Sequence, residues 1–270
     1  MAIPTVSIGG LKVSKLILGG NPFSGFSHQG VEADQAMLHY YTSDRIKQEY
    51  RRAERLGINT HLGRADHHII RVLMEYWDEG GTIQWFAQTC PEIGTSLRGV
   101  QNAVRGGAAA CYLHGGRMDW MLANSRLDEA VEAVAAIRKA GLPAGVAGHS
   151  TAVFDWAEDN LDVDFYMCCY YNPDDRSRRP ERPAGAPEVY LPEARQAMLQ
   201  RIATLSKPAI HYKVFAAGRN DPREALNFVA RHLRPQDAVC IGVFSKDNPD
   251  MLAEDVRLFE EAMAAVAAKA

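Results

Sequence analysis

The chain has 270 residues, 47% of them hydrophobic and 23% charged, with a formal net charge of −3. These totals fit one barrel-type domain of about 250 residues. Nucleic acid is not an expected partner, because there is no basic stripe along the sequence. A membrane is not expected either, because no apolar run approaches the roughly 20 residues of a membrane span. Five cysteines without C-x-x-C spacing, and a start that lacks the features of a secretory signal, favour buried thiols in a reducing compartment and a cytoplasmic location.

Short apolar runs alternate with amphipathic stretches along the whole chain. Most of the runs are continuously apolar, as is typical of parallel strands covered on both faces. The expected strands are Ser14–Gly19, Ile58–Leu62, Ile83–Gln88, Ala108–His114, Ala144–Gly148, Val163–Cys169, Pro208–Val214 and Ala238–Val243. Eight strand-and-helix units without a long linker predict a single (β/α)₈ TIM barrel over residues 1–270. A doubly wound open sheet is the alternative.

The expected helices have recognisable ends. One helix, Asp44–Leu56, follows Ser43, and another is expected over Leu127–Ala140. A capping residue followed by proline opens the seventh helix at Asp221-Pro222 and the eighth at Asn248-Pro249.

The connection over residues 172–190 is long, charged and rich in proline. We expect a mobile loop over the barrel mouth there. Its arginines, Arg176, Arg178, Arg179 and Arg182, are expected to become ordered through ion pairs, a partner subunit or bound substrate. The alternative is a solvated excursion.

Several segments occur in the order and at the intervals of one known family. They are Ser7–Ser14 with Leu16–Asn21, Gly57–Thr60, Ala110–His114, Tyr171-Asn172 with Arg176 and Glu181, and Tyr212–Gly218. With these segments the chain resembles the aldo/keto reductases, which implies an aldo/keto reductase-like barrel.

The resemblance does not extend to that family's catalytic residues. The family reduces a carbonyl with Asp, Tyr, Lys and His, but the first three positions hold Leu62, His67 and Gln88 here, and only His114 remains. The pair that holds the nicotinamide amide falls near Ala147-Gly148. Asp250 stands where a cation would grip the adenosine phosphate, and an acid there repels an anionic group. NADP binding is therefore disfavoured, and we assign no cofactor-binding residue.

Barrel enzymes carry their function at the C-terminal ends of the strands, and polar residues are dense there. His114 and Lys213 are the expected proton-transfer pair, since a desolvated amine has a lowered pKa and histidine titrates near neutrality. The expected substrate-binding residues are Asn21, Arg64, Asp66, Gln88, Tyr171, Asn172, Arg176 and Arg219. The structural alternative for Lys213 is a salt bridge to Glu92 or Asp66.

The histidines allow further interpretations. Glu92, His114 and His149 follow neighbouring strands and are candidate ligands of a divalent metal. His61 lies on the strand face directed at the helices, which favours a structural role, and His67 adjoins a helix start, which is equally typical of a solvated or capping residue.

The leading hypothesis is a lyase or isomerase acting on a small polyhydroxylated or hydroxy-carbonyl substrate. One alternative is a divergent NADPH-dependent reductase in which His67 or Tyr171 donates the proton. Another is a catalytically degenerate binding or regulatory barrel. A small molecule is the expected partner, and a homo-oligomer is compatible with the sequence.

Overall fold

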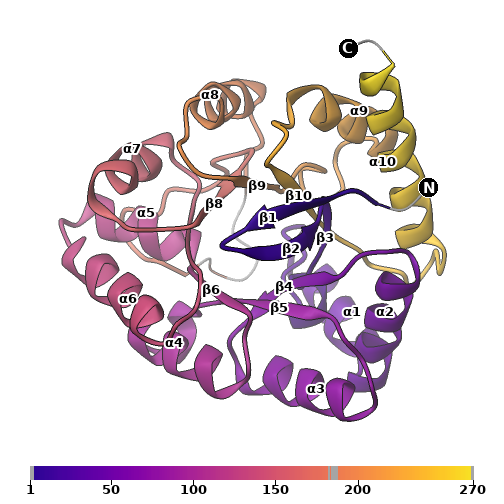
Figure 1. Ribbon diagram of the computed structural model, residues 1–270, viewed down its shortest axis with the longest axis horizontal. Helices are drawn as coiled ribbons and strands as arrows, with labels where there is room; N and C mark the ends of the chain where they lie inside the picture. Colours follow the sequence, from indigo (N-terminus) through magenta and orange to yellow (C-terminus); the bar gives the residue numbers. More distant parts are fainter. Residues whose placement is uncertain (1–2, 182, 184–187, 269–270) are drawn as a thin grey trace.

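The computed structural model describes residues 3–181, 183 and 188–268, and within them a closed barrel of parallel strands surrounded by helices (Figure 1). The barrel strands are β3 (Leu16–Gly19), β4 (Thr60–Arg64), β5 (Gln84–Gln88), β6 (Ala110–Leu113), β7 (Ala144–Gly148), β8 (Phe165–Cys169), β9 (Ala209–Tyr212) and β10 (Ala238–Gly242). They follow one another around the barrel in chain order, and β10 closes it against β3. The predicted (β/α)₈ barrel is confirmed, and the open-sheet alternative is wrong.

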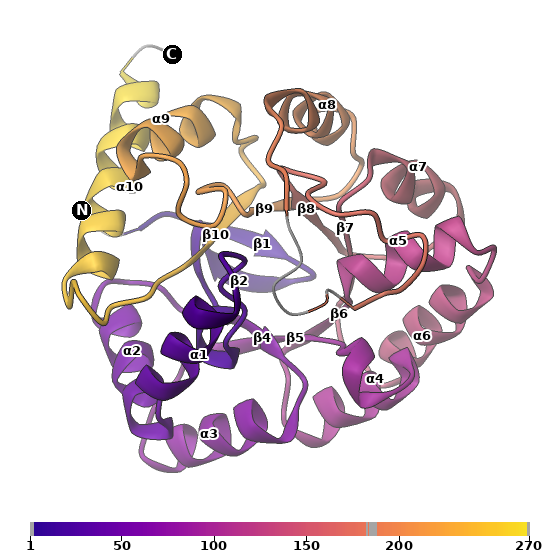
Figure 2. The ribbon, with the colours of Figure 1, turned by 180° about the vertical axis from the view of Figure 1, so that it is seen from behind.

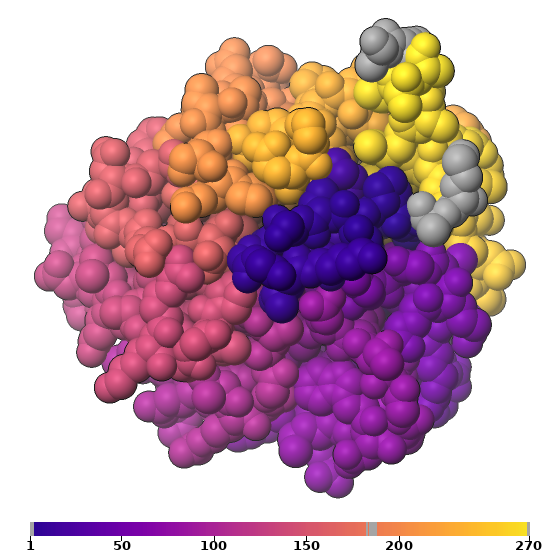
Figure 3. Space-filling view, viewed as in Figure 1, coloured from indigo at the N-terminus to yellow at the C-terminus, as the bar shows by residue number. Residues whose placement is uncertain are grey.

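A hairpin covers the N-terminal end of the barrel. Its strands are β1 (Thr5–Ile8) and β2 (Leu11–Ser14), which lie across the barrel opening in Figure 1 and cover its centre in the space-filling view of Figure 3. Ile8 and Val13 of the hairpin are fully buried and pack with Ile17, Phe86 and Phe165 of the barrel interior. Because this end is sealed by apolar side chains, the opposite end is the one open to ligands.

Helices form the outer ring of the barrel and connect its strands. They are α1 (Val31–Tyr40), α2 (Ser43–Arg55), α3 (His67–Asp78), α4 (Ser96–Arg105), α5 (Gly115–Ala123), α6 (Asp128–Lys139), α7 (Thr151–Asn160), α8 (Pro192–Ile202), α9 (Pro222–His232) and α10 (Met251–Ala267). Two short 3-10 turns, η1 (Pro22–Ser24) and η2 (Pro91–Ile93), follow β3 and β5. In the described part of the chain, none of the helices has the length and apolar character that a membrane crossing requires.

Two of the expected helix starts differ from the structure. The cap of α2 is Thr42 rather than Ser43, since the Thr42 side chain accepts from the Arg45 amide. The helix expected to begin at Asn248-Pro249 is α10, and it begins at Met251. The Asn248 side chain accepts from the Asp250 amide and closes a turn before the helix. The Asp221 cap of α9 is confirmed, since its side chain accepts from the Glu224 amide.

The register of neighbouring strands determines which side chains meet at the open end. Arg64 and Gln88 are paired at the last positions of β4 and β5. The carboxyl ends of β6 and β7 likewise bring His114 and His149 to the same end, one residue beyond each strand. Figure 2 shows this end of the barrel, with α1 and the described part of the connection after β8 beside it.

All five cysteines are free thiols. Cys90, Cys111, Cys168 and Cys169 are buried, and Cys240 is half-buried. Burial raises the pKa of the Cys240 thiol to about 12, so it stays protonated at neutral pH. The expectation of buried thiols is confirmed for four of the five.

Candidate functional site

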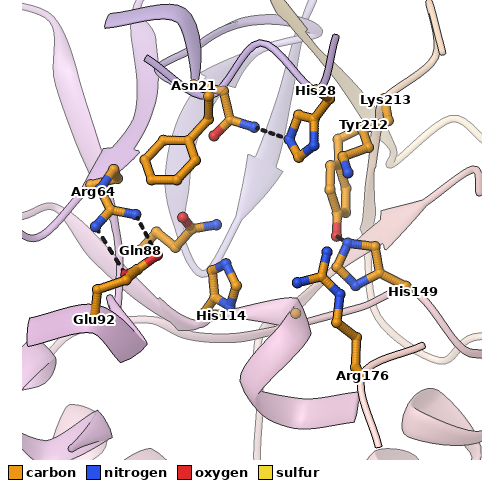
Figure 4. A pocket seen from close by; sticks show the side chains of 12 residues that line it. Asn21, His28, Arg64, Gln88, Glu92, His114, His149, Arg176, Tyr212 and Lys213 are labelled. Carbon is orange, nitrogen blue, oxygen red and sulfur yellow. Dashed lines mark hydrogen bonds and ion pairs between the residues drawn. The ribbon is translucent and has the colours of Figure 1, made fainter. Parts of the chain in front are cut away.

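Two adjoining cavities lie at the open end of the barrel. We call the smaller one, of about 50 Å³, the polar chamber (Figure 4). Its lining residues are Asn21, Phe26, His28, Arg64, Gln88, Glu92, His114, Gly115, His149, Arg176, Tyr212 and Lys213. We call the larger one, of about 570 Å³, the apolar cleft, and it shares Asn21, Phe26, His28, Gln88, Tyr212 and Lys213 with the chamber. His114, His149 and Lys213 therefore lie together at one cavity, as expected.

His149 is held by a buried carboxylate. Its Nδ1 lies 2.7 Å from Asp119 Oδ2, and the backbone amides of His149 and Ser150 also donate to Asp119. This carboxylate fixes the proton on Nδ1, so Nε2 is left as an acceptor, 3.5 Å from the Tyr212 hydroxyl. Burial lowers the pKa of His149, and Asp119 opposes that shift only in part. His149 is therefore a neutral imidazole with a basic nitrogen directed toward Tyr212 at the chamber wall.

His114 has the opposite tautomer. Its Nδ1 accepts from the Arg117 amide at 3.3 Å as the cap of α5, which places the ring proton on Nε2. Burial lowers the pKa of His114 well below its usual value, and the charge of Arg176 acts in the same direction. His114 is thus a neutral donor, and Figure 4 shows its ring directed into the chamber.

Two glycines after His114 allow the surrounding segments to approach. A Cβ on Gly115 would lie 3.0 Å from the Tyr212 hydroxyl and 3.1 Å from His149 Cε1. A Cβ on Gly116 would lie 2.5 Å from the Pro180 carbonyl oxygen. The sequence Gly115-Gly116 therefore permits the close packing of both histidines with the connection after β8.

Lys213 follows β9 in an unusual backbone conformation. Its φ is 56°, in the left-handed region that costs a residue with a Cβ on the order of 1 kcal/mol or more. Its side chain is 8% exposed, and its Nζ lies 4.0 Å from Glu188 Oε1. The structural alternative, a salt bridge of Lys213 to Glu92 or Asp66, is wrong, because both of these carboxylates pair with Arg64.

Glu188 is the common partner of several groups around the chamber. Its Oε1 lies 2.9 Å from His28 Nδ1 and 4.0 Å from an Arg176 guanidinium nitrogen, and Oε2 accepts from the Tyr190 hydroxyl at 2.7 Å. Burial alone would raise the pKa of Glu188, but the His28 hydrogen bond and the Lys213 charge hold it well below its usual range. Glu188 is therefore a buried carboxylate that positions these groups.

Arg64, Gln88 and Asn21 line the chamber as expected. Arg64 donates to Glu92 at 3.0 Å and to Asp66 at 3.0 Å, and it lies over the Phe26 ring. Asn21 donates to His28 Nε2 at 3.4 Å, and this contact is drawn in Figure 4.

Four expected substrate-binding residues do not line either cavity. Asp66 caps α3, and the Tyr171 hydroxyl accepts from Asn220. Asn172 is exposed. Arg219 is also exposed, and it donates to backbone carbonyls while lying over the Tyr190 ring. Each of these side chains has a structural partner or faces solvent. Position after a strand alone therefore predicted more cavity-lining residues than the structure places at the two cavities.

The connection 172–190 contributes a residue to the chamber. Arg176 is only 6% exposed, whereas Arg178 and Arg179 are exposed. Arg182 lies outside the described residues, and the expected mobility of the loop stays a prediction. Burial of Arg176 shows that this part of the connection is not a solvated excursion.

The expected metal ligands do not form a metal site. Glu92 is paired with Arg64. Within residues 3–181, 183 and 188–268 there is no group of three His, Cys, Asp or Glu side chains placed to hold an ion. The structure therefore does not bring Glu92, His114 and His149 together as a ligand set, and metal binding by this protein stays a prediction.

The other histidines match or correct the sequence interpretation. His61 is fully buried, and its Nδ1 lies 3.1 Å from the Leu18 carbonyl oxygen, in agreement with a structural role. His67 is exposed at the start of α3 and lines neither cavity. It is therefore not placed to act as a proton donor.

Sequence reasoning missed Asp119, Glu188 and Tyr212 as members of the site. Asp119 lies on α5, five residues after His114, on the side facing His149. A polar residue on the first turns of a helix that follows a candidate catalytic strand is a signal that could have found it.

No protein-family model matches the sequence, and no curated protein matches it. Many solved structures are similar in three dimensions, among them the following three. A candidate aldo-keto reductase from Pseudomonas aeruginosa is 20% identical over 96% of this chain and 94% of its own, with a TM-score of 0.61. The apo form of Gox0644 is 14% identical over 98% and 93%, with a TM-score of 0.62. A truncated 3-deoxy-D-arabino-heptulosonate 7-phosphate synthase from Thermotoga maritima is 11% identical over 98% and 94%, with a TM-score of 0.57.

These identities are low, so the likeness concerns the fold and carries no activity with it. The closed barrel, its hairpin cover and the order of its strands agree with the expected resemblance. The chain has an aldo/keto reductase-like TIM-barrel fold.

Proposed function

We propose that this chain is an enzyme of the isomerase or lyase type that removes a proton from the carbon next to a carbonyl group in a small hydroxy-carbonyl substrate. The observation that carries the proposal is the pair of neutral histidines with opposite tautomers. His149 Nε2 is a base and His114 Nε2–H is a donor, and both belong to one chamber. A base and a hydrogen-bond donor at one cavity are what enolisation requires.

The roles follow from the hydrogen bonds of each residue. His149 takes the proton from carbon, and Asp119 stabilises the imidazolium that forms. The electron pair moves to the carbonyl oxygen, which receives a hydrogen bond from His114 and faces the Lys213 charge. In isomerisation the proton returns to the former carbonyl carbon, and the proton of the hydroxyl on the deprotonated carbon moves to the former carbonyl oxygen, so that the carbonyl group changes place. In elimination the electron pair of the enolate instead expels a group from the β-carbon, and the departing group takes the proton held by His149.

The charges around the chamber favour a polyhydroxylated or anionic substrate. Arg64, Arg176 and Lys213 line it, and Glu92 is the carboxylate among its lining residues. Asn21 and Gln88 add amide groups that bind hydroxyls. These donors favour oxygen-rich substrates over apolar ones at this position.

Deuterium exchange tests the proposal. Hydroxyacetone, dihydroxyacetone and D-fructose are incubated with the protein in D₂O, and loss of the C–H signal next to the carbonyl is followed by NMR. We expect exchange that falls by about 10² to 10⁴ in His149→Gln, the usual contribution of a general base. His39→Gln, at an exposed histidine of α1, is the matched control. Exchange no faster than in buffer for all three compounds, or an unchanged rate in His149→Gln, contradicts the proposal.

A second candidate function is NADPH-dependent reduction. The observation in its favour is the apolar cleft beside the chamber, because Gox0644, whose fold is similar, has been solved in complex with NADPH. Asp247 and Asp255 line this cleft, and their charges disfavour a phosphate-rich cofactor. Fluorescence titration with NADPH decides: micromolar affinity favours the reductase, and we expect none.

A further inference from the structure

The apolar cleft has a much larger volume than the polar chamber. Its volume of about 570 Å³ lies in the usual range of small-molecule sites, whereas the chamber has about 50 Å³. Its lining passes from Leu62 and Tyr112 inside the barrel to Met251 and Asp255 on the first turns of α10. A substrate held in the chamber therefore has room for a second group of considerable size.

The walls of the cleft are mostly apolar and partly aromatic. Phe215 and Phe244 contribute rings after β9 and β10, and Met37 and Met251 contribute flexible apolar side chains from α1 and α10. Aromatic and thioether side chains of this kind bind flat hydrocarbon surfaces. This composition differs from that of the chamber, which is lined by charged and amide groups.

One carboxyl group at the α10 end is buried and borders the cleft. Asp255 is 4% exposed and lines the cleft, and no hydrogen bond or ion pair of its side chain is found among the described residues. Burial, and secondarily the charge of Glu254, raises the pKa of Asp255 to about 7. Because this carboxyl group borders the cleft, a ligand there that donates a hydrogen bond can bind to it.

The charges along the cleft differ between its two ends. Asp247 and Asp255 belong to the α10 end, while Lys213 belongs to the end shared with the chamber. Among the described residues that line the cleft, Lys213 is the only lysine or arginine. The α10 end therefore favours a hydrogen-bond donor and disfavours an anion.

We propose that the apolar cleft binds a flat apolar group of the ligand that carries a hydrogen-bond donor, a hydroxyl or an amine, at the end facing Asp255. The inference rests on the proposed function in one respect: this group is attached to the hydroxy-carbonyl part that the chamber binds. The enzyme would then act on conjugates of a sugar-like part with an aromatic part rather than on free small sugars alone.

Direct binding tests the inference without turnover. Isothermal titration calorimetry measures the affinity of four probes with the same ring system: 2-naphthol, 2-naphthylmethylamine, 2-naphthoate and 2-methylnaphthalene. We expect 2-naphthol or the amine to bind about tenfold more tightly than 2-naphthoate, as one hydrogen bond to a carboxyl group allows. Tighter binding of 2-naphthol would identify the preferred donor as a hydroxyl, and tighter binding of 2-naphthylmethylamine would identify it as an amine.

Variants locate the effect. Asp255→Leu should weaken the preferred donor probe about tenfold and leave 2-methylnaphthalene unchanged, while Asp255→Asn, which keeps an acceptor oxygen, should lose less. Glu132→Gln is the control, since Glu132 is exposed on α6 and does not line the cleft. Thermal unfolding checks that each variant is folded.

Several outcomes overturn the inference. These are equal or tighter binding of 2-naphthoate, an unchanged donor affinity in Asp255→Leu, or micromolar NADPH binding that displaces the naphthol. His149→Gln should bind 2-naphthol normally, because His149 does not line the cleft. A result that contradicts ligand binding in the cleft can therefore be distinguished from one that contradicts the proposed proton transfer.

Discussion

Asp119 and His149 form a buried pair in which the carboxylate Oδ2 lies 2.7 Å from Nδ1 of the imidazole. Asp119 also accepts from the backbone amides of His149 and Ser150, so the carboxylate is fixed by the turn that begins α7. The pair gives His149 one defined tautomer before any substrate binds. The proposed chemistry depends on this relationship more than on any other contact of the chamber.

Asp119→Asn should therefore impair the reaction without unfolding the protein. The amide oxygen can still accept from the two backbone amides, but an amide cannot stabilise the imidazolium as a carboxylate does. We expect the exchange rate to fall by about a hundredfold or more, while the thermal midpoint changes little. An exchange rate within twofold of the wild-type value would assign Asp119 a structural role only.

The pH dependence of the reaction should report the lowered pKa of His149. Burial lowers this pKa and Asp119 raises it by less, so the midpoint of His149 titration lies below the usual value of 6.5. We expect the acid limb of kcat/KM for exchange to have its midpoint below pH 6.5. In Asp119→Asn the raising effect is lost, so the acid limb should move further down. An acid limb with a midpoint above pH 7 would contradict the assignment of His149 as the base.

The sequence predicted the barrel and the part of the site that depends on strand ends. His114, His149 and Lys213 were found because the last residues of parallel strands converge at one end of a barrel, whatever the connections do. Glu188 could not be found in this way, since its contact with His28 joins positions 160 residues apart through an irregular segment. Arg219 and Asn172 show the converse error: both follow a strand, but the path of the following segment leaves each of them exposed.

Glu188→Gln tests the carboxylate that joins the loop to the barrel. Glutamine cannot supply the negative charge that faces Lys213, Arg176 and His28 in the wild type. We expect a loss of about 3 kcal/mol in the free energy of unfolding, as when one partner of a buried ion pair is removed. Urea denaturation measures it, and Glu181→Gln in the same connection is the control. A change below 0.5 kcal/mol, the usual range for surface positions, would mean that Glu188 does not hold the loop.

Gly116→Ala should separate stability from activity. Alanine inside a helix is normally more stabilising than glycine by about 0.5 to 1 kcal/mol, and Gly116 belongs to α5. Its Cβ, however, would lie 2.5 Å from the Pro180 carbonyl oxygen and 3.3 Å from an Arg176 guanidinium nitrogen. The connection must move away, so we expect exchange to fall by about tenfold or more, because small displacements of orienting groups are costly in rate, while the helix remains folded. Circular dichroism and the exchange assay together check this, and unchanged exchange would show that Arg176 does not orient the substrate.

The buried carboxyl of Asp255 should make stability depend on pH in an unusual direction. Its pKa is about 7 in the folded protein, against the ordinary aspartate value of 3.8 in the unfolded chain, so between these values the folded state binds more protons than the unfolded state. The contribution of Asp255 is therefore fully present below pH 3.8, falls as the pH rises through 7 and stays low above it. A difference of about three pKa units corresponds to an upper limit of roughly 4 kcal/mol for the effect on the free energy of unfolding.

Asp255→Asn, which does not titrate, should be more stable than the wild type at pH 8, and this difference in stability should become smaller toward pH 5. Urea denaturation at pH 5, 6, 7 and 8 measures the difference, with Glu132→Gln, at an exposed glutamate of α6, as control. Equal pH dependence of the wild type and Asp255→Asn would mean that Asp255 is ionised in the folded protein and has a partner when the cleft is empty.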